Sequence, residues 1–168
     1  MSSPRVQGAL AALGFCAALA GLCALAGCGY APVRGRPAGG LRVAAVRNDT
    51  AQAEVGGLFA AELRRELAGR GMLEPDSSSA PELRAEVRAL RSAPSGVSAE
   101  GGAASFRLDA ELRVEAPEYA DTLAGGEDYL AGVDVLGTEA NRRAALRRLM
   151  RTLAAEAIER YEVAQRFR

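Results

Sequence analysis

One stretch of the chain alternates without interruption between apolar and charged residues: Phe106-Arg107-Leu108-Asp109-Ala110-Glu111-Leu112-Arg113-Val114-Glu115. Successive side chains of a β-strand point to opposite faces of a sheet, so this pattern predicts a strand with one buried and one charged face. An upstream run repeats it, with Arg84, Glu86 and Arg88 alternating with Leu83, Ala85, Val87 and Ala89. The residues Pro94-Ser95-Gly96 and Gly101-Gly102 fit a loose hairpin loop between the two strands.

Two segments outside these strands have helical spacing. Upstream, Val55, Phe59, Leu63 and Leu67 stand four residues apart, and Gly69 and Gly71 supply a C-terminal stop. We expect this helix to be capped by Asp49 or Thr50. The second helix is expected to start at a capping Thr138 and to reach Tyr161 or beyond, with one apolar stripe along it.

Arginines crowd the first half of the second helix, where the helix dipole disfavours cations: Arg142, Arg143, Arg147, Arg148 and Arg151. This placement is explained either by a partner or surface that they serve, or by a plain solvated face. Elsewhere the pattern is weaker. We expect a buried strand over 41–46, broken by Arg47-Asn48-Asp49-Thr50, a short edge strand over 72–74, and an irregular segment over 117–137 with a short strand near 129–135.

The N-terminus has the features of a secretory leader. Arg5 precedes an uncharged apolar run over 9–24, which is interrupted by glycine and falls short of the ~20 residues of a membrane span. It ends in Leu25-Ala26-Gly27-Cys28, which resembles a bacterial lipobox, whose cysteine receives a diacylglyceryl group. We therefore expect a cleaved signal peptide (1–27), a lipid-anchored tether (28–40) and one periplasmic α+β domain (41–168). An uncleaved anchor, or an ordinary signal with an incidental cysteine, is the alternative.

Composition narrows the classes of function. Arginine and lysine together number 21, as do the acidic residues, and this balance argues against a nucleic-acid partner. The chain has no histidine, and its cysteines are Cys16, Cys23 and Cys28, all in the leader or at its end. A Ser-His or Cys-His nucleophile pair and the usual zinc ligands are therefore missing. We expect no cofactor, no metal and no enzymatic activity.

Several short motifs occur together in the order tether, strand, helix, strands and long helix: Cys28-Gly29-Tyr30, Arg34-Gly35, Val43-Ala44-Ala45-Val46, Asn48-Asp49-Thr50, Leu63-Arg64-Arg65-Glu66-Leu67 and Asn141-Arg142-Arg143-Ala144-Ala145. Their combination resembles the lipopolysaccharide-assembly outer-membrane lipoproteins (LptE-like). The resemblance implies an α+β fold, with two helices packed on one face of a mostly four-stranded mixed β-sheet. It also implies a non-catalytic plug in the lumen of an LptD-type outer-membrane β-barrel, which helps to assemble the barrel and to deliver lipopolysaccharide. Gly29 after the cysteine resembles the residue typical of outer-membrane lipoproteins.

Within this interpretation, strand geometry suggests four lipopolysaccharide contacts: Arg84, Arg88, Arg107 and Arg113. The alternative is that these arginines form cross-strand pairs on a wet face. Two other functions stay open. One is an outer-membrane lipoprotein that activates a peptidoglycan synthase, against which stands the short tether, since about a dozen residues span at most ~3.3–3.6 Å each. The other is a carboxylate-dependent envelope hydrolase.

Overall fold

The computed structural model describes residues 40–99 and 101–167. The expected signal peptide 1–27, the lipidation site Cys28 and the tether up to residue 39 lie outside this part of the chain. In the described part, five strands form one sheet in the order β1-β3-β4-β5, with β2 also paired to β3. The strands are β1 (Arg42–Val43), β2 (Arg47–Asn48), β3 (Glu82–Val97), β4 (Ala103–Ala116) and β5 (Tyr119–Leu130).

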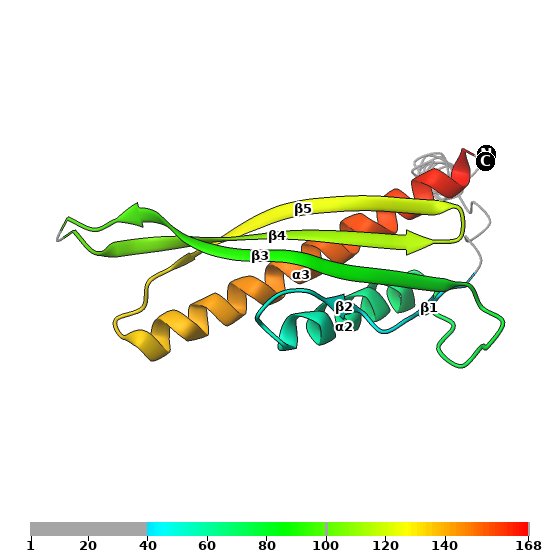
Figure 1. The fold of residues 1–168 in the computed structure, drawn as a ribbon, viewed down its shortest axis with the longest axis horizontal. Helices are drawn as coiled ribbons and strands as arrows, with labels where there is room; N and C mark the ends of the chain where they lie inside the picture. Colours follow the sequence, from blue (N-terminus) through cyan, green and yellow to red (C-terminus); the bar gives the residue numbers. More distant parts are fainter. Residues whose placement is uncertain (1–39, 100, 168) are drawn as a thin grey trace, which may run out of the picture. The chain divides into compact units, whose positions relative to one another are not determined.

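The sheet is mixed. β1 and β2 run parallel to β3, whereas β3, β4 and β5 are antiparallel neighbours. Two helices, α2 (Glu54–Gly69) and α3 (Val135–Arg166), lie on one face of the sheet, as Figure 1 shows. The predicted α+β fold, with two helices on one face of a mixed sheet, is confirmed.

The hydrophobic core lies between the sheet and the helices. The alternation read from the sequence places Leu83 and Val87 of β3, and Leu108 and Leu112 of β4, on the covered face, where all four are fully buried. They are joined by the apolar stripes of the helices, including Phe59, Leu63, Leu153 and Ile158. Burial of this apolar area is the main driving force for the fold.

The expectation of an irregular segment over 117–137 is wrong. Residues 119–130 form β5, which pairs with β4 along its whole length, from Ala116↔Tyr119 to Ser105↔Leu130. The alternation is hidden because two inward-facing positions of β5 are acidic. Asp121 accepts a hydrogen bond from Arg160 of α3 (3.0 Å), and Glu127 accepts one from Arg148 (2.6 Å). The helix thus supplies the charges that make these strand residues acceptable.

The first strand is also different from the prediction. The chain pairs with β3 at 42–43, leaves it over 44–46, and pairs again at Arg47–Asn48, where the sequence suggested a break. The register advances from Val43↔Leu83 to Arg47↔Glu86, so the segment from β1 to β2 has one residue more than the facing part of β3. This is the two-against-one count of a β-bulge. The expected edge strand at 72–74 is an isolated bridge between Leu73 and Leu41.

Strand β3 contains a second irregularity, at Arg88. Val87 pairs with Leu112 but Ala89 pairs with Glu111, so Arg88 is the extra residue of a bulge. The inward-facing positions therefore change from odd to even numbers, and Ala89 is not part of the core as its alternation suggested. Beyond the bulge, β3 continues through Pro94-Ser95-Gly96, which were expected to form a loop.

Both helix starts lie away from the expected caps. α2 begins at Glu54, and its N-cap Ala53 makes no side-chain capping bond, whereas Thr50 lies in the preceding turn and donates its backbone N–H to Asn48 Oδ1 (3.1 Å). α3 begins three residues before Thr138. Its cap is Asp134, whose carboxylate accepts the backbone N–H of Gly137 (2.6 Å).

Candidate binding surface on the open face of the sheet

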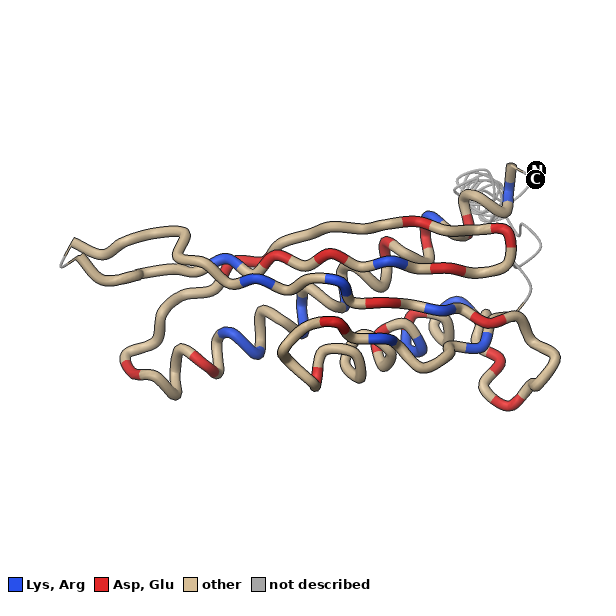
Figure 2. The backbone as a smooth tube through the Cα atoms, in the orientation of Figure 1, with Lys and Arg blue, Asp and Glu red and all other residues tan. Residues whose placement is uncertain are grey.

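The face of the sheet opposite the helices carries alternating charge. Because the apolar half of each strand is used by the core, the charged half of β3 and β4 points away from the helices. Figure 2 shows the resulting blue and red segments along the middle strands. The four arginines predicted to contact lipopolysaccharide, Arg84, Arg88, Arg107 and Arg113, all belong to this open face.

Each of these arginines is paired with carboxylates of the same face. Most partners lie two residues along the same strand: Arg84 Nε to Glu82 (3.1 Å), Arg107 Nε to Asp109 (3.0 Å), and Arg113 Nε to Glu115 (2.6 Å). Arg107 also reaches Asp128 of β5 (3.3 Å), and Arg88 lies 3.5 Å from Glu86 and 3.8 Å from Glu111. Exposed ion pairs of this kind stabilise a fold little, typically by ~0–1 kcal/mol. They are therefore easily exchanged for a ligand.

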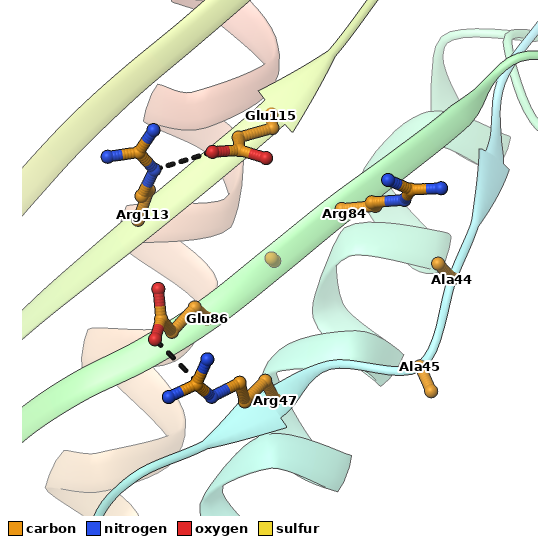
Figure 3. A pocket seen from close by; sticks show the side chains of 8 residues that line it. Ala44, Ala45, Arg47, Arg84, Glu86, Arg113 and Glu115 are labelled. Carbon is orange, nitrogen blue, oxygen red and sulfur yellow. Dashed lines mark hydrogen bonds and ion pairs between the residues drawn. The ribbon is translucent and has the colours of Figure 1, made fainter.

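A shallow pocket of about 500 Å³ lies on this face, where the segment between β1 and β2 separates from β3. Figure 3 shows Arg47, Arg84 and Arg113 around it, with Glu86 and Glu115 between them. Small residues line the rest of it: Ala44, Ala45 and Ala85. The pocket forms because residues 44–46, between β1 and β2, do not follow β3 closely.

The charges in and beside the pocket influence one another. A hydrogen bond from Arg47 Nε (2.9 Å) lowers the pKa of Asp49, and a hydrogen bond from Arg84 lowers the pKa of Glu82. Both carboxylates are therefore ionised at neutral pH. Three guanidinium groups and two carboxylates around a small-residue floor suit a ligand that carries phosphate together with hydroxyl groups, because guanidinium binds phosphate through two parallel hydrogen bonds.

The structure divides the predicted arginines into two groups. Arg84 and Arg113 line the pocket, whereas Arg88 lies at the bulge and Arg107 lies farther along β4. Sequence reasoning missed Arg47, because its segment was expected to break the strand rather than to pair with β3. Its alternation with Val46 and Asn48 is too short to show by itself that Arg47 belongs to the sheet.

Within residues 40–99 and 101–167, no group of three or more His, Cys, Asp or Glu side chains is placed to bind a metal ion. In the same residues, no helix is both long enough and apolar enough to cross a membrane.

The fold and the surface define a small α+β domain, with its helices on one face and an ion-paired sheet on the other. Comparison with protein families extends this to a particular family: residues 38–161 match LptE, described as lipopolysaccharide-assembly. The chain therefore belongs to the LptE family of lipopolysaccharide-assembly proteins, as its motifs suggested. A comparison with curated proteins gives no match.

Two solved lipoprotein structures are similar to this chain. Rare lipoprotein B from Shewanella oneidensis superposes with a TM-score of 0.51 at 15% identity, covering 74% of this chain and 96% of the other. A minor lipoprotein from Acinetobacter baumannii gives a TM-score of 0.44 at 17% identity, covering 75% and 92%. At these identities the likeness to rare lipoprotein B shows the fold alone.

Proposed function

We propose that this protein is a non-catalytic outer-membrane lipoprotein that sits in the lumen of an LptD-type β-barrel. It helps the barrel to assemble and helps lipopolysaccharide to reach the outer leaflet. The observation that carries this proposal is the family match over residues 38–161, which spans nearly the whole described domain. A charged sheet face and a nearly neutral chain also suit the polar lumen of such a barrel.

The membrane attachment in this proposal is the acylated Cys28. It becomes the N-terminal residue of the mature protein when residues 1–27 are removed. Residues 28–40 then tether the domain 41–168 to the inner leaflet of the outer membrane. Two or three acyl chains hold a protein far more firmly than one, because each buried methylene contributes ~0.8 kcal/mol. Mass spectrometry of the native protein tests this step: we expect a mature N-terminus at Cys28 that carries diacylglycerol. An unmodified thiol, or a retained leader, contradicts it.

Co-purification tests the barrel partner. The lipidated protein, with a C-terminal affinity tag, is extracted from outer membranes in mild detergent and captured. We expect the LPS-translocating β-barrel in the eluate, and we expect it to be absent when Cys28→Ala replaces the wild type. Capture of the wild type without any barrel would refute the proposal.

The lipopolysaccharide contacts are proposed at Arg84, Arg88, Arg107 and Arg113. Arg84 and Arg113 are the sharper test, since both line the pocket. Hydrogen bonds to charged groups contribute ~1.5–3 kcal/mol each, so Arg84→Glu/Arg113→Glu is expected to weaken lipopolysaccharide binding by about 100-fold or more.

The matched control is Arg64→Glu/Arg166→Glu, which makes the same change in net charge at two exposed helix positions. We expect this control to bind lipopolysaccharide like the wild type, and both variants to retain the barrel. Equal loss of binding in the two double variants would mean that only total charge matters, and would remove the pocket from the proposal.

A further inference from the structure

The arginines of α3 differ from those of the sheet in how far they are neutralised. Arg147 is exposed and has no ion pair with any residue that the structure describes. Arg151 lies 3.8 Å from the buried carboxylate of Glu62, which also pairs with Arg65. One acid is thus shared by two arginines whose side chains are each more than 60% exposed.

The same sharing occurs about two turns earlier in α3. Arg142 and Arg143 both bond to Glu139, with Nε–Oε distances of 2.7 Å and 2.9 Å. On the open face of the sheet, Arg113 pairs with Glu115, while Arg84 shares Glu82 with Arg42. The first half of α3 therefore carries a run of arginines that is only partly neutralised, and the positive end of the helix dipole adds to it.

Large apolar side chains are exposed immediately before these arginines. Val133 is fully exposed, and Val135, Leu136 and Leu130 are exposed by 83%, 80% and 68%. Large apolar residues that are this exposed and this close in sequence mark an interaction site more often than single ones do.

Leu136 shares a helix face with the basic side chains, and the other three exposed apolar side chains come directly before it in the chain. Residues seven and four apart share a helix face, so Leu136, Arg143 and Arg147 point to one side of α3. A shallow pocket of about 440 Å³ on that side is lined by Leu58 of α2 and Leu146 of α3, with Arg143, Arg147 and Glu54 around it. Arg143 and Arg147 thus lie beside the apolar side chains of Leu58 and Leu146.

We propose that this surface docks the domain on a membrane leaflet that contains anionic phospholipid. We call it the α3 docking strip and define it by four apolar and three basic residues: Leu130, Val133, Val135, Leu136, Arg143, Arg147 and Arg151. Its apolar side chains enter the headgroup region, and its arginines bind the lipid phosphates. The combination favours a lipid surface over an acidic protein, because an acidic protein would satisfy the arginines but leave four large apolar side chains in water.

This inference goes beyond the proposed function, because the docking strip needs no barrel. A domain tethered at Cys28 would bind the leaflet through a second, weaker contact, which orients it before it enters its partner. Each arginine near an anionic surface is expected to change membrane affinity on the order of fivefold. Arg143→Glu/Arg147→Glu should therefore weaken membrane binding by well over tenfold.

The experiment measures the exposure of a single fluorophore on the reconstituted lipoprotein. Ala140→Cys places a label beside the docking strip, and Ala124→Cys places one on β5; both residues are exposed. The three native cysteines lie at or before position 28, so the label is specific in the mature lipoprotein. Quenching by acrylamide is compared in vesicles of phosphatidylethanolamine with phosphatidylglycerol, and in vesicles of phosphatidylcholine alone.

We expect the label at position 140 to be protected in the anionic vesicles only, and to lose that protection in high salt and in Arg143→Glu/Arg147→Glu. The label at position 124 should stay accessible throughout. The matched control Arg91→Glu/Arg166→Glu changes net charge equally, away from the strip, and should leave protection unchanged.

Three results would overturn the proposal: equal protection in both kinds of vesicle, protection that survives Arg143→Glu/Arg147→Glu, or protection that appears only when lipopolysaccharide replaces phosphatidylglycerol. Protection that appears only after the barrel is added would assign the strip to an acidic protein and would also overturn it. A failed barrel capture leaves these measurements unaffected, so the two proposals fail separately.

Discussion

Gly125 lies at an inward-facing position of β5, against α3. A Cβ added there would stand 3.0 Å from Leu153 Cδ2 and 3.5 Å from Leu149 Cδ1, so strand and helix pack too closely for a branched side chain. We expect Gly125→Val to lower the free energy of unfolding by ~1–3 kcal/mol, measured by urea denaturation, because overpacking forces neighbouring side chains out of their rotamers.

The control for this substitution is another glycine, Gly57 in α2. A Cβ there meets nothing within 4 Å, and the backbone is already helical. Gly57→Ala should therefore raise the free energy of unfolding by ~0.5–1 kcal/mol. If Gly125→Val were as stable as the wild type, the close contact between β5 and α3 would be wrong.

Glu139 is the carboxylate most affected by its neighbours. A hydrogen bond from Arg142, with further help from Arg143, lowers the pKa of Glu139 from 4.5 to about 2. Since this pKa is lowered in the folded state, the stabilisation is fully present above pH 4.5 and is lost as the pH falls through about 2.

NMR titration of the Glu139 side chain tests this directly. In Arg142→Gln we expect the pKa of Glu139 to rise toward 4.5, because the first cause of its lowering is removed. In Glu139→Gln the melting temperature should fall less between pH 4.5 and pH 2 than it does in the wild type. An ordinary pKa for Glu139 in the wild-type protein would show that its bonds to the two arginines do not persist in solution.

The helices differ in how they begin. Asp134 caps α3 by accepting the N–H of Gly137 at 2.6 Å, while α2 has no side-chain cap. Asp134→Ala is expected to destabilise the protein by ~0.5–2 kcal/mol, and Asp134→Asn by much less, since Asn also caps well. Thermal unfolding of both variants measures the difference; equal losses would show that charge, and not the cap, is what Asp134 provides.

The buried face of strand β3 was predicted correctly before Arg88 and incorrectly after it. The alternation of residues 83–87 is confirmed, since Leu83, Ala85 and Val87 are buried. After the bulge at Arg88 the inward-facing residues have even numbers, so the odd-numbered positions point to the open face. A bulge depends on which partner residue is reached across the sheet, so the sequence of one strand does not reveal it.

The domain as a whole depends on the middle of α3 and not on its end. Residues after Tyr161 contribute an ion pair between Arg70 and Glu162, whereas Met150, Leu153 and Ile158 are fully buried. A chain that ends at Tyr161 should therefore fold and unfold cooperatively, with a modestly lower melting temperature.

A chain that ends at Leu149 lacks the buried residues Met150, Leu153 and Ile158 and exposes the inner face of β5, so we expect it not to fold. Circular dichroism and urea denaturation distinguish the two truncations. A cooperative transition in the shorter chain would show that α2 and the sheet form a sufficient core without the second half of α3.

On the scale of the molecule, its two faces have different charge chemistry. Most arginines on the open face of the sheet lie among nearby carboxylates, whereas in the first half of α3 Arg142 and Arg143 share Glu139 and Arg147 has no ion pair with any described residue. Both contain exposed arginines of similar spacing, so composition alone does not separate them. The division follows from which carboxylates the fold brings within reach of each guanidinium group.

Features that depend on local periodicity could be predicted from the amino-acid sequence. The buried faces of α2, α3, β4 and the first half of β3 follow from apolar spacing, because neighbouring residues of a regular element share a face whatever lies opposite them. The family also follows from the sequence, through motifs near Val43 and Asn48. In contrast, β5, the bulges and the helix starts depend on contacts between distant parts of the chain. The inward-facing acids of β5 are stable there because Arg148 and Arg160 of α3 lie opposite them, and a contact between residues 21 or 39 positions apart leaves no periodic signal in the chain.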